Sequence, residues 1–248
     1  MAANWANKKG YFEPEDIAAC HDKILATVGS SWSDWREFPP SWFSSPDAVR
    51  SRDELVSLFI ANYDKAPLSV LKEPRMCRML PLWNEVFKKL DSRPLFCFID
   101  RSPLEVAASL KARDGSSIEQ GLLYYIRNHL DAEFQTRFRP RAFVSYNALL
   151  KDWRQTVAFV SDRLNVPFQL SGKSEHEVDI FLESDLKNQK GEVPRNASDP
   201  IEELAFAVHE AFAKLSGGES DAAVRDQLDR LRALFNARES EHYGPVQN

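Results

Sequence analysis

Two cations follow the short apolar run at residues 68–71, and their spacing is suited to holding an anion. Lys72 comes directly after the run, and Arg75 follows three residues later. A lysine at the end of a buried strand can reach over the sheet edge and neutralise an oxyanion. We therefore take Lys72 as a candidate catalytic residue and Arg75 as a candidate substrate-binding residue. The alternative is a structural salt bridge from Lys72 to Glu73 or Asp100.

Arg101 comes at the end of a second apolar run, and Ser109 follows it inside an expected helix. Ser102 to Glu105 has the pattern of a capping box with proline at the first helical position. Strand, turn and helix then succeed one another, and the helix N-terminus faces the sheet edge. An arginine fork and a hydroxyl near a helix N-terminus form a plausible phosphate clamp. Ser109 taken alone fits an ordinary helix residue equally well.

Positioning these residues requires an alternation of strands and helices. Short runs rich in β-branched and aromatic residues predict buried parallel strands at 68–71, 95–99 and 142–146. Apolar residues at spacings of three and four predict helices at 50–63, 78–90, 103–113, 118–137 and 147–164, the last capped by Asn147. After Phe168 the pattern is helical and ends in an amphipathic helix at 224–235, which packs on the main body or binds a partner. The alternation predicts an α/β fold, with residues 1–168 as the main domain and 169–248 as a helical extension packed on it.

Composition excludes several classes of protein. The 248 residues carry a net charge of −5, which disfavours a nonspecific partner for nucleic acid. Residues 72–113 still hold nine Lys and Arg against five Asp and Glu; a small anionic ligand explains this excess, and a solvated helix face is the alternative. Three scattered cysteines indicate a reduced, cytoplasmic setting. No apolar run approaches the length of a membrane span.

Other catalytic patterns are missing from the sequence. It has no Walker-type phosphate loop, and its histidines show no metal-binding pair and no Ser/His/Asp order. We expect these histidines on the surface or in the core: His21, His129, His176, His209 and His242. The aromatic residues between 32 and 50 either line an acceptor pocket or pack as core or lid.

Together and in this order, the segments resemble the sulfotransferase family that uses 3′-phosphoadenosine 5′-phosphosulfate (PAPS), in particular its bacterial branch. The resemblance extends over about two thirds of the chain, through Lys9–Glu13, Lys72–Arg75, Asp100–Ser109 and Ser145–Leu150, to about Phe168. It implies a three-layer parallel sheet similar to the P-loop nucleotide-hydrolase-like fold of these enzymes.

The resemblance also implies roles for single residues. Arg101 and Ser109 match the residues that bind the 3′-phosphate of PAPS, and Tyr146 matches a tyrosine near the adenine. A buried tyrosine satisfied by the backbone is the alternative for Tyr146. Lys72 matches the lysine that contacts the transferring sulfuryl group, and Glu13 is the candidate general base. The implied reaction is in-line transfer from PAPS, as cosubstrate, to a hydroxyl or amine without a metal.

The sequence departs from the family pattern in two places. Family members open with a strand and a Gly- and Ser-rich loop that cradles the 5′-phosphosulfate; Gly29–Trp32 lacks its spacing, so we expect the front strand and loop to be missing. Residues 186–191 stand where relatives are richer in Arg and His. We expect transferase activity if the loop is supplied, on a small-molecule, glycan or lipid acceptor and in a possible homo-oligomer. The alternative is an inactive or truncated homologue that serves as a nucleotide-binding or interaction module.

Overall fold

A computed structural model describes residues 10, 12–63, 66–182, 195–196 and 198–243. Its contacts divide the chain into two units, the first of residues 1–94, 127–135 and 236–248, the second of residues 95–126 and 136–235. The departure noted at residues 186–191 lies outside the described residues. None of the described helices is both long enough and apolar enough to cross a membrane.

The first unit is built from helices that share one apolar core. Its elements are α1 (Glu15–Ala26), the 3-10 helix η1 (Pro40–Ser44), α2 (Pro46–Tyr63) and α3 (Met76–Lys89), together with parts of α5 (Ile118–Thr136) and α10 (Asp221–Tyr243). Fully buried residues from three of these helices, Ile17, Leu55 and Trp83, meet in the core. Phe38 and Trp42 also belong to it, with ring centroids 5.3 Å apart in an edge contact. These two aromatic residues are therefore core residues.

The second unit contains two parallel strands whose carboxyl ends coincide. β1 (Phe96–Asp100) pairs with β2 (Arg141–Ser145), and the register sets Asp100 opposite Ser145. The chain between them forms α4 (Pro103–Asp114) and α5, the crossover that parallel strands require. Because the strands end in register, the residues that follow them, Arg101 and Tyr146, emerge at the same edge of the sheet.

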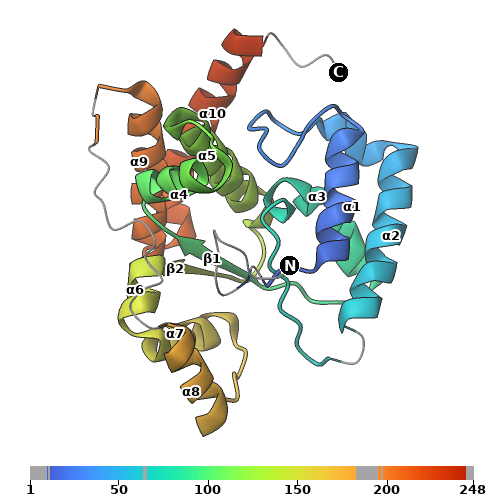
Figure 1. The fold of residues 1–248 in the computed structure, drawn as a ribbon, viewed down its shortest axis with the longest axis vertical. Helices are drawn as coiled ribbons and strands as arrows, with labels where there is room; N and C mark the ends of the chain where they lie inside the picture. The colour runs from blue at the N-terminus through green and yellow to red at the C-terminus, as the bar shows by residue number, and fades with distance from the viewer. Residues whose placement is uncertain (1–9, 11, 64–65, 183–194, 197, 244–248) are drawn as a thin grey trace. The chain divides into compact units, whose positions relative to one another are not determined.

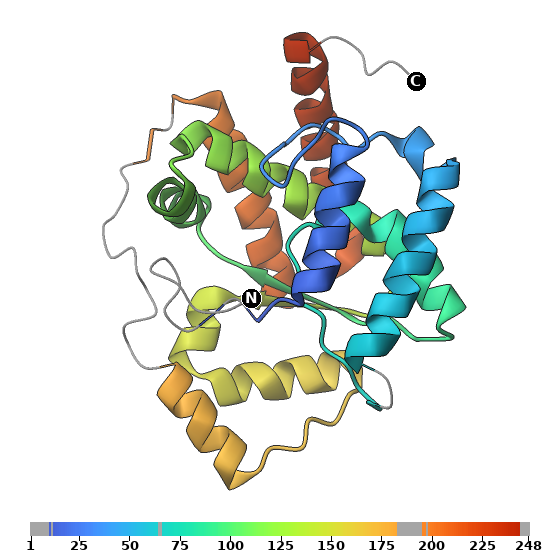
Figure 2. The same cartoon turned by 45° about the vertical axis from the view of Figure 1, so that its right-hand side comes forward.

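Helices cover both faces of β2. After α6 (Tyr146–Lys151), α7 (Trp153–Leu164) contacts β2, as does α9 (Pro200–Ser216), which also contacts β1. Figures 1 and 2 show α7 and α9 on opposite sides of the strands. Phe98 stacks on Phe143 with centroids 4.8 Å apart, and Phe212 of α9 meets both rings edge-on. This aromatic cluster fixes α9 on the sheet.

The helical extension expected after Phe168 is present as α8 (Gly172–Phe181), α9 and α10. The expected domain division at residue 168 stays a prediction; α8 and α9 belong to the same unit as both strands. The predicted strands at 95–99 and 142–146 are confirmed to within a residue. The second is buried as expected, whereas the first is not, because Cys97 and Ile99 are exposed. The described part is mostly helical and holds one parallel pair, which is compatible with an α/β fold.

The predicted strand at 68–71 is wrong. These residues have no regular secondary structure, and the side chain of Val70 is 75% exposed. An apolar run becomes a strand only where another strand can pair with it and a layer can cover it. Here the run remains at the surface, in the segment that leads to α3.

The predicted single helix at 147–164 is also wrong, because it is two helices. The break lies at Asp152, whose backbone is extended and whose carboxylate accepts a hydrogen bond from the Gln155 amide at 3.0 Å. This is an N-cap for α7. The cap of α6 is Ser145, so Asn147, expected to cap the helix, lies inside its first turn.

Candidate functional site

The two candidate catalytic residues are paired in the first unit. Lys72 Nζ donates a hydrogen bond to Glu13 Oε1, although 59 residues separate them in sequence. Glu13 is buried, whereas the Lys72 side chain is 56% exposed. The carboxylate that holds Lys72 is therefore Glu13 rather than Glu73 or Asp100. The buried Glu13 carboxylate thus holds the Lys72 ammonium group near the surface.

Glu73 is committed to a different, buried network. Its carboxylate accepts hydrogen bonds from His21 Nδ1 and from Arg75. Trp83 Nε1 donates to His21 Nε2 at 2.9 Å, so this nitrogen carries no proton and His21 is the neutral Nδ1–H tautomer. His21 is thus a satisfied core histidine. Arg75 also donates to Asp22, so the candidate substrate-binding arginine is held between two carboxylates.

Burial and hydrogen bonding act in opposite directions on Glu73. Burial alone would raise the pKa of this carboxyl. The hydrogen bond from His21, together with the hydrogen bond and positive charge of Arg75, outweighs that effect and holds the pKa below its ordinary value. Glu73 is therefore a charged structural anchor for the residues around it.

In the second unit, five residues gather where the two strands end. We call Asp100, Arg101, Glu105, Tyr146 and His209 the strand-end cluster. The Arg101 guanidinium carbon lies 4.9 Å from the centroid of the Tyr146 ring, a cation–π distance. The structure thus brings together two of the three residues expected to bind the nucleotide.

The predicted capping box at the start of α4 is wrong. Ser102 is the N-cap residue, but its side chain makes no capping hydrogen bond. Glu105, the expected reciprocal partner, instead accepts a hydrogen bond from Arg101 Nε at 2.7 Å. A charge-assisted bond to a guanidinium is stronger than one to a neutral backbone amide. The hydrogen bond from Arg101 to Glu105 therefore holds Arg101 beside the first turn of α4.

One nitrogen of Arg101 is left without a partner. Arg101 Nη2 is buried and makes no hydrogen bond to any residue that the structure describes. Leaving a buried donor unsatisfied costs about 1–3 kcal/mol. A phosphate oxygen would satisfy this donor, so the cluster fits an anionic ligand. Ser109 lies exposed on α4, and none of the described contacts of Arg101 involves it.

A second polar network adjoins Arg101, and the sequence did not indicate it. The Asp100 carboxylate accepts a hydrogen bond from the Tyr125 hydroxyl at 2.6 Å and lies 2.6 Å from His209 Nδ1. Burial, followed by the charge and hydrogen bond of Asp100, raises the pKa of Tyr125, which keeps its proton. The only signal in the sequence was an acid directly before Arg101 at a strand end.

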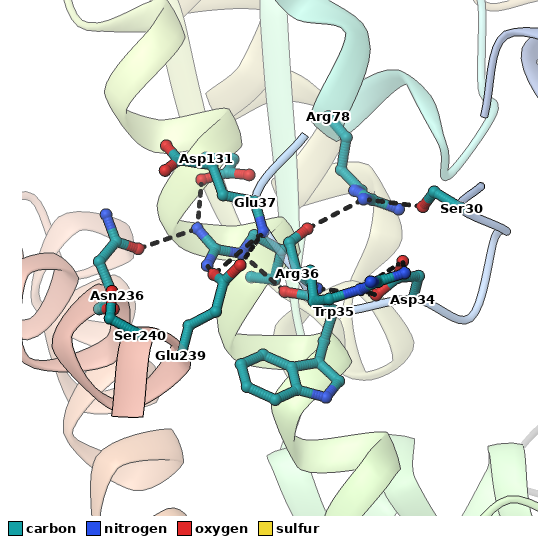
Figure 3. Close-up of polar contacts among 11 residues, drawn as sticks. Ser30, Asp34, Trp35, Arg36, Glu37, Arg78, Asp131, Asn236, Glu239 and Ser240 are labelled. Carbon is teal, nitrogen blue, oxygen red and sulfur yellow. Dashed lines mark hydrogen bonds and ion pairs between the residues drawn. The ribbon is translucent and has the colours of Figure 1, made fainter. Parts of the chain in front are cut away.

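The sequence also missed a buried arginine in the first unit. Arg127 Nε donates to the carbonyl of Trp35 at 2.9 Å, and its other nitrogens bind Asp131, Asn236 and Glu239. Figure 3 shows Asp131, Asn236 and Glu239 converging on this point, with Trp35 beside them. We call these five residues the Arg127 cluster.

The segment at residues 30–37 is held from several sides. Arg78 donates to the carbonyl of Arg36 at 2.9 Å and to Ser30 Oγ at 3.3 Å (Figure 3). The backbone amide of Glu37 donates to the Glu239 carboxylate at 2.9 Å. Every nitrogen of the Arg127 guanidinium has a partner in the Arg127 cluster, so the cluster has the character of a structural anchor.

Possible metal ligands do not gather in groups of three within the part of the chain that the structure describes. Compared with family models, with curated proteins and with solved structures, the chain matches none of them. We take the strand-end cluster as the candidate ligand site, because one buried nitrogen of Arg101 has no partner there among the described residues.

Proposed function

We propose that this chain binds a 3′-phosphorylated adenine nucleotide at the strand-end cluster and transfers a sulfuryl group from PAPS to a hydroxyl or amine. The observation that carries the proposal is Arg101 Nη2, a buried donor without a partner among the described residues, on an arginine that lies over the Tyr146 ring. A planar guanidinium matches the oxygens of a phosphate, and a nearby aromatic ring offers a surface for a base.

The second unit holds the proposed nucleotide site. Arg101 holds the 3′-phosphate through its unsatisfied nitrogen, while Glu105 keeps the guanidinium in place. Ser109 adds a hydroxyl from α4, the helix that also carries Glu105. Tyr146 lies toward the adenine. The parallel pair of β1 and β2 belongs, in this proposal, to a three-layer sheet similar to that of sulfotransferases.

From the resemblance, we assign the transfer step to residues of the first unit. PAPS, when bound, provides the activated sulfuryl group. Lys72 neutralises negative charge on the transferring group, and Glu13, its partner, accepts the proton of the acceptor. Arg75 lies in the same segment, where it orients the acceptor, a small molecule, glycan or lipid. We place the reaction in the cytoplasm.

Calorimetric titration with adenosine 3′,5′-bisphosphate and adenosine 5′-monophosphate tests the nucleotide site. A charge-assisted hydrogen bond contributes about 1.5–3 kcal/mol, so we expect about a tenfold to hundredfold preference for the bisphosphate. Arg101→Ala should remove most of this preference. Equal affinities of the wild-type chain for the two nucleotides would overturn the proposal.

Arg154→Ala is the matched control. Arg154 also lies over an aromatic ring, that of Trp153 at 4.5 Å, and also binds carboxylates, those of Asp179 and Glu175, but it is exposed. We expect this variant to keep the preference for the bisphosphate. A similar loss in both variants would mean that the effect is general and not a property of the Arg101 site.

Transfer of labelled sulfate from PAPS tests the transfer step. If the wild-type chain transfers the label and Lys72→Ala does not, the result would support the proposed transferase activity. The alternative function, a noncatalytic nucleotide-binding module, is favoured by the engagement of Lys72 with Glu13 and of Arg75 with two carboxylates. Selective binding of the bisphosphate without any transfer would identify that alternative.

A further inference from the structure

His209 joins the strand-end cluster from a helix that the sequence did not connect with nucleotide binding. Its Nδ1 atom lies 2.6 Å from Asp100 Oδ2. The other oxygen of Asp100 accepts the hydroxyl of Tyr125 at 2.6 Å. Asp100 is buried, and its two oxygens face Tyr125 and His209, so its negative charge acts on the imidazole at short range.

The side chain of His209 can exchange a proton with solvent. Its Nδ1 atom is buried beside Asp100, but the side chain as a whole is 29% exposed, so solvent can reach the ring. The hydrogen bond to Asp100 is the largest influence on His209 and raises its pKa above the ordinary value, although burial acts in the opposite direction. The imidazolium form is therefore favoured toward neutral pH.

Charged groups on three elements face His209. Asp100 lies on β1, Glu105 on α4 and Glu210 on α9 itself, and all three favour the imidazolium. Tyr125 of α5 acts through Asp100. In the chain segment before α9, Arg195 lies over the ring of Phe206, whose centroid is 6.4 Å from that of His209.

Arg101 shares one of these acids, Glu105, with His209, and a second one, Asp100, is its neighbour in the chain. Glu105 accepts the hydrogen bond of Arg101 Nε and also faces His209, and Asp100 directly precedes Arg101 in the chain. With a neutral imidazole, the two carboxylates outweigh the single guanidinium, and the strand-end cluster is negative by one charge. With an imidazolium the cluster is neutral. An anion approaching Arg101 meets less repulsion in the second state.

We propose that His209 is a specificity-determining residue of this site, whose protonation is coupled to the occupation of Arg101 by the 3′-phosphate of a nucleotide. The inference rests on the proposed nucleotide binding and adds to it a proton that is taken up with the ligand. Coupling of this kind is reciprocal: protonation of His209 tightens binding, and binding raises the proton affinity of His209. The bisphosphate should therefore be favoured over the monophosphate most strongly at mildly acidic pH.

Two measurements on the whole chain test this coupling. The first is calorimetry with adenosine 3′,5′-bisphosphate between pH 6 and pH 8, in pairs of buffers that differ in ionisation heat, so that proton uptake is counted. We expect His209→Gln to take up fewer protons on binding than the wild-type chain. The ratio of its affinities at pH 6 and pH 8 should be about fivefold smaller than that of the wild-type chain. His176→Gln, at an exposed histidine of α8, is the control and should keep both. The protonation of the nucleotide itself is common to all three proteins.

The second measurement needs no variant. The imidazole C–H resonance of His209 is followed against pH by NMR, with and without the bisphosphate, and its midpoint should rise when the ligand is bound. An unchanged midpoint, or equal proton uptake in the wild-type chain and His209→Gln, would overturn the inference and leave the nucleotide site standing. Failure of the wild-type chain to bind the bisphosphate at any pH would overturn both.

Discussion

Replacing Arg127 by methionine removes a fully buried cation and retains an apolar stem of similar length. The guanidinium makes four described hydrogen bonds, to Trp35, Asp131, Asn236 and Glu239. Without it, two carboxylates lose their cation inside the protein. Removal of one partner from a buried ion pair costs about 3–5 kcal/mol. That is a large share of a total stability of about 5–15 kcal/mol.

Urea unfolding of the wild-type chain and of Arg127→Met measures this cost. A loss of about 4 kcal/mol should also lower the melting temperature by roughly 8–16 °C in a chain of this size. The matched control is Arg50→Met, which breaks an ion pair to Asp47 whose arginine is 70% exposed. Exposed pairs contribute about 0–1 kcal/mol, so the control should remain close to the wild type.

The double variant Arg127→Met with Glu239→Gln separates charge from packing. Burial raises the pKa of Glu239, and the charge of Arg127 acts in the opposite direction. Removing the carboxylate that the first change leaves behind should therefore restore part of the lost stability. A loss below about 1 kcal/mol in Arg127→Met, within the range of an exposed pair, would refute the view that the Arg127 cluster is a buried anchor.

Two further predictions concern other parts of the fold. The lowered pKa of Glu73 means that its stabilisation is complete above the ordinary carboxyl value of 4.5 and is lost as the pH falls through the lower, folded value. The difference in unfolding free energy between the wild-type chain and Glu73→Gln should therefore shrink below pH 4.5, and a constant difference would contradict this cause. In the second unit, a Cβ atom on Gly121 would lie 2.7 Å from Ala107 Cα, so Gly121→Ala should cost about 1–3 kcal/mol in thermal unfolding. Gly172→Ala, where a Cβ meets nothing within 4 Å, should cost nothing measurable.

The sequence predicted both strands correctly from their apolar, aromatic runs. Arg141–Ser145 is covered by helices, whereas Phe96–Asp100 pairs with it but exposes Cys97 and Ile99. The run at 68–71 looks similar in sequence but is exposed, because pairing depends on residues far away that no local window contains. The apolar spacing on either side of Asp152 predicts one continuous helix. The helix is interrupted there because the Asp152 carboxylate binds the Gln155 amide and so caps a new helix.

Only part of the candidate site could be predicted from the sequence. Arg101 and Tyr146 follow strands that were recognised, and the carboxyl ends of parallel strands meet at one edge, so their encounter was expected. The contact between Asp100 and His209 joins distant parts of the chain, and no spacing rule connects them. The sequence pattern predicted that Glu105 caps the helix. Its hydrogen bond to Arg101 depends on side-chain geometry, which the pattern does not contain.

The Arg127 cluster has a consequence for the order in which the chain acquires its structure. Its hydrogen bonds join residues 92, 109 and 112 positions apart in sequence. Contacts between such distant residues require the closure of long loops, which slows folding. On the ribosome, residues 15–63 can form their helices long before Asn236 and Glu239 have been synthesised. Until then, Arg78 can hold the segment at 30–37, but the bonds from Glu37 and Arg127 to the end of α10 cannot form.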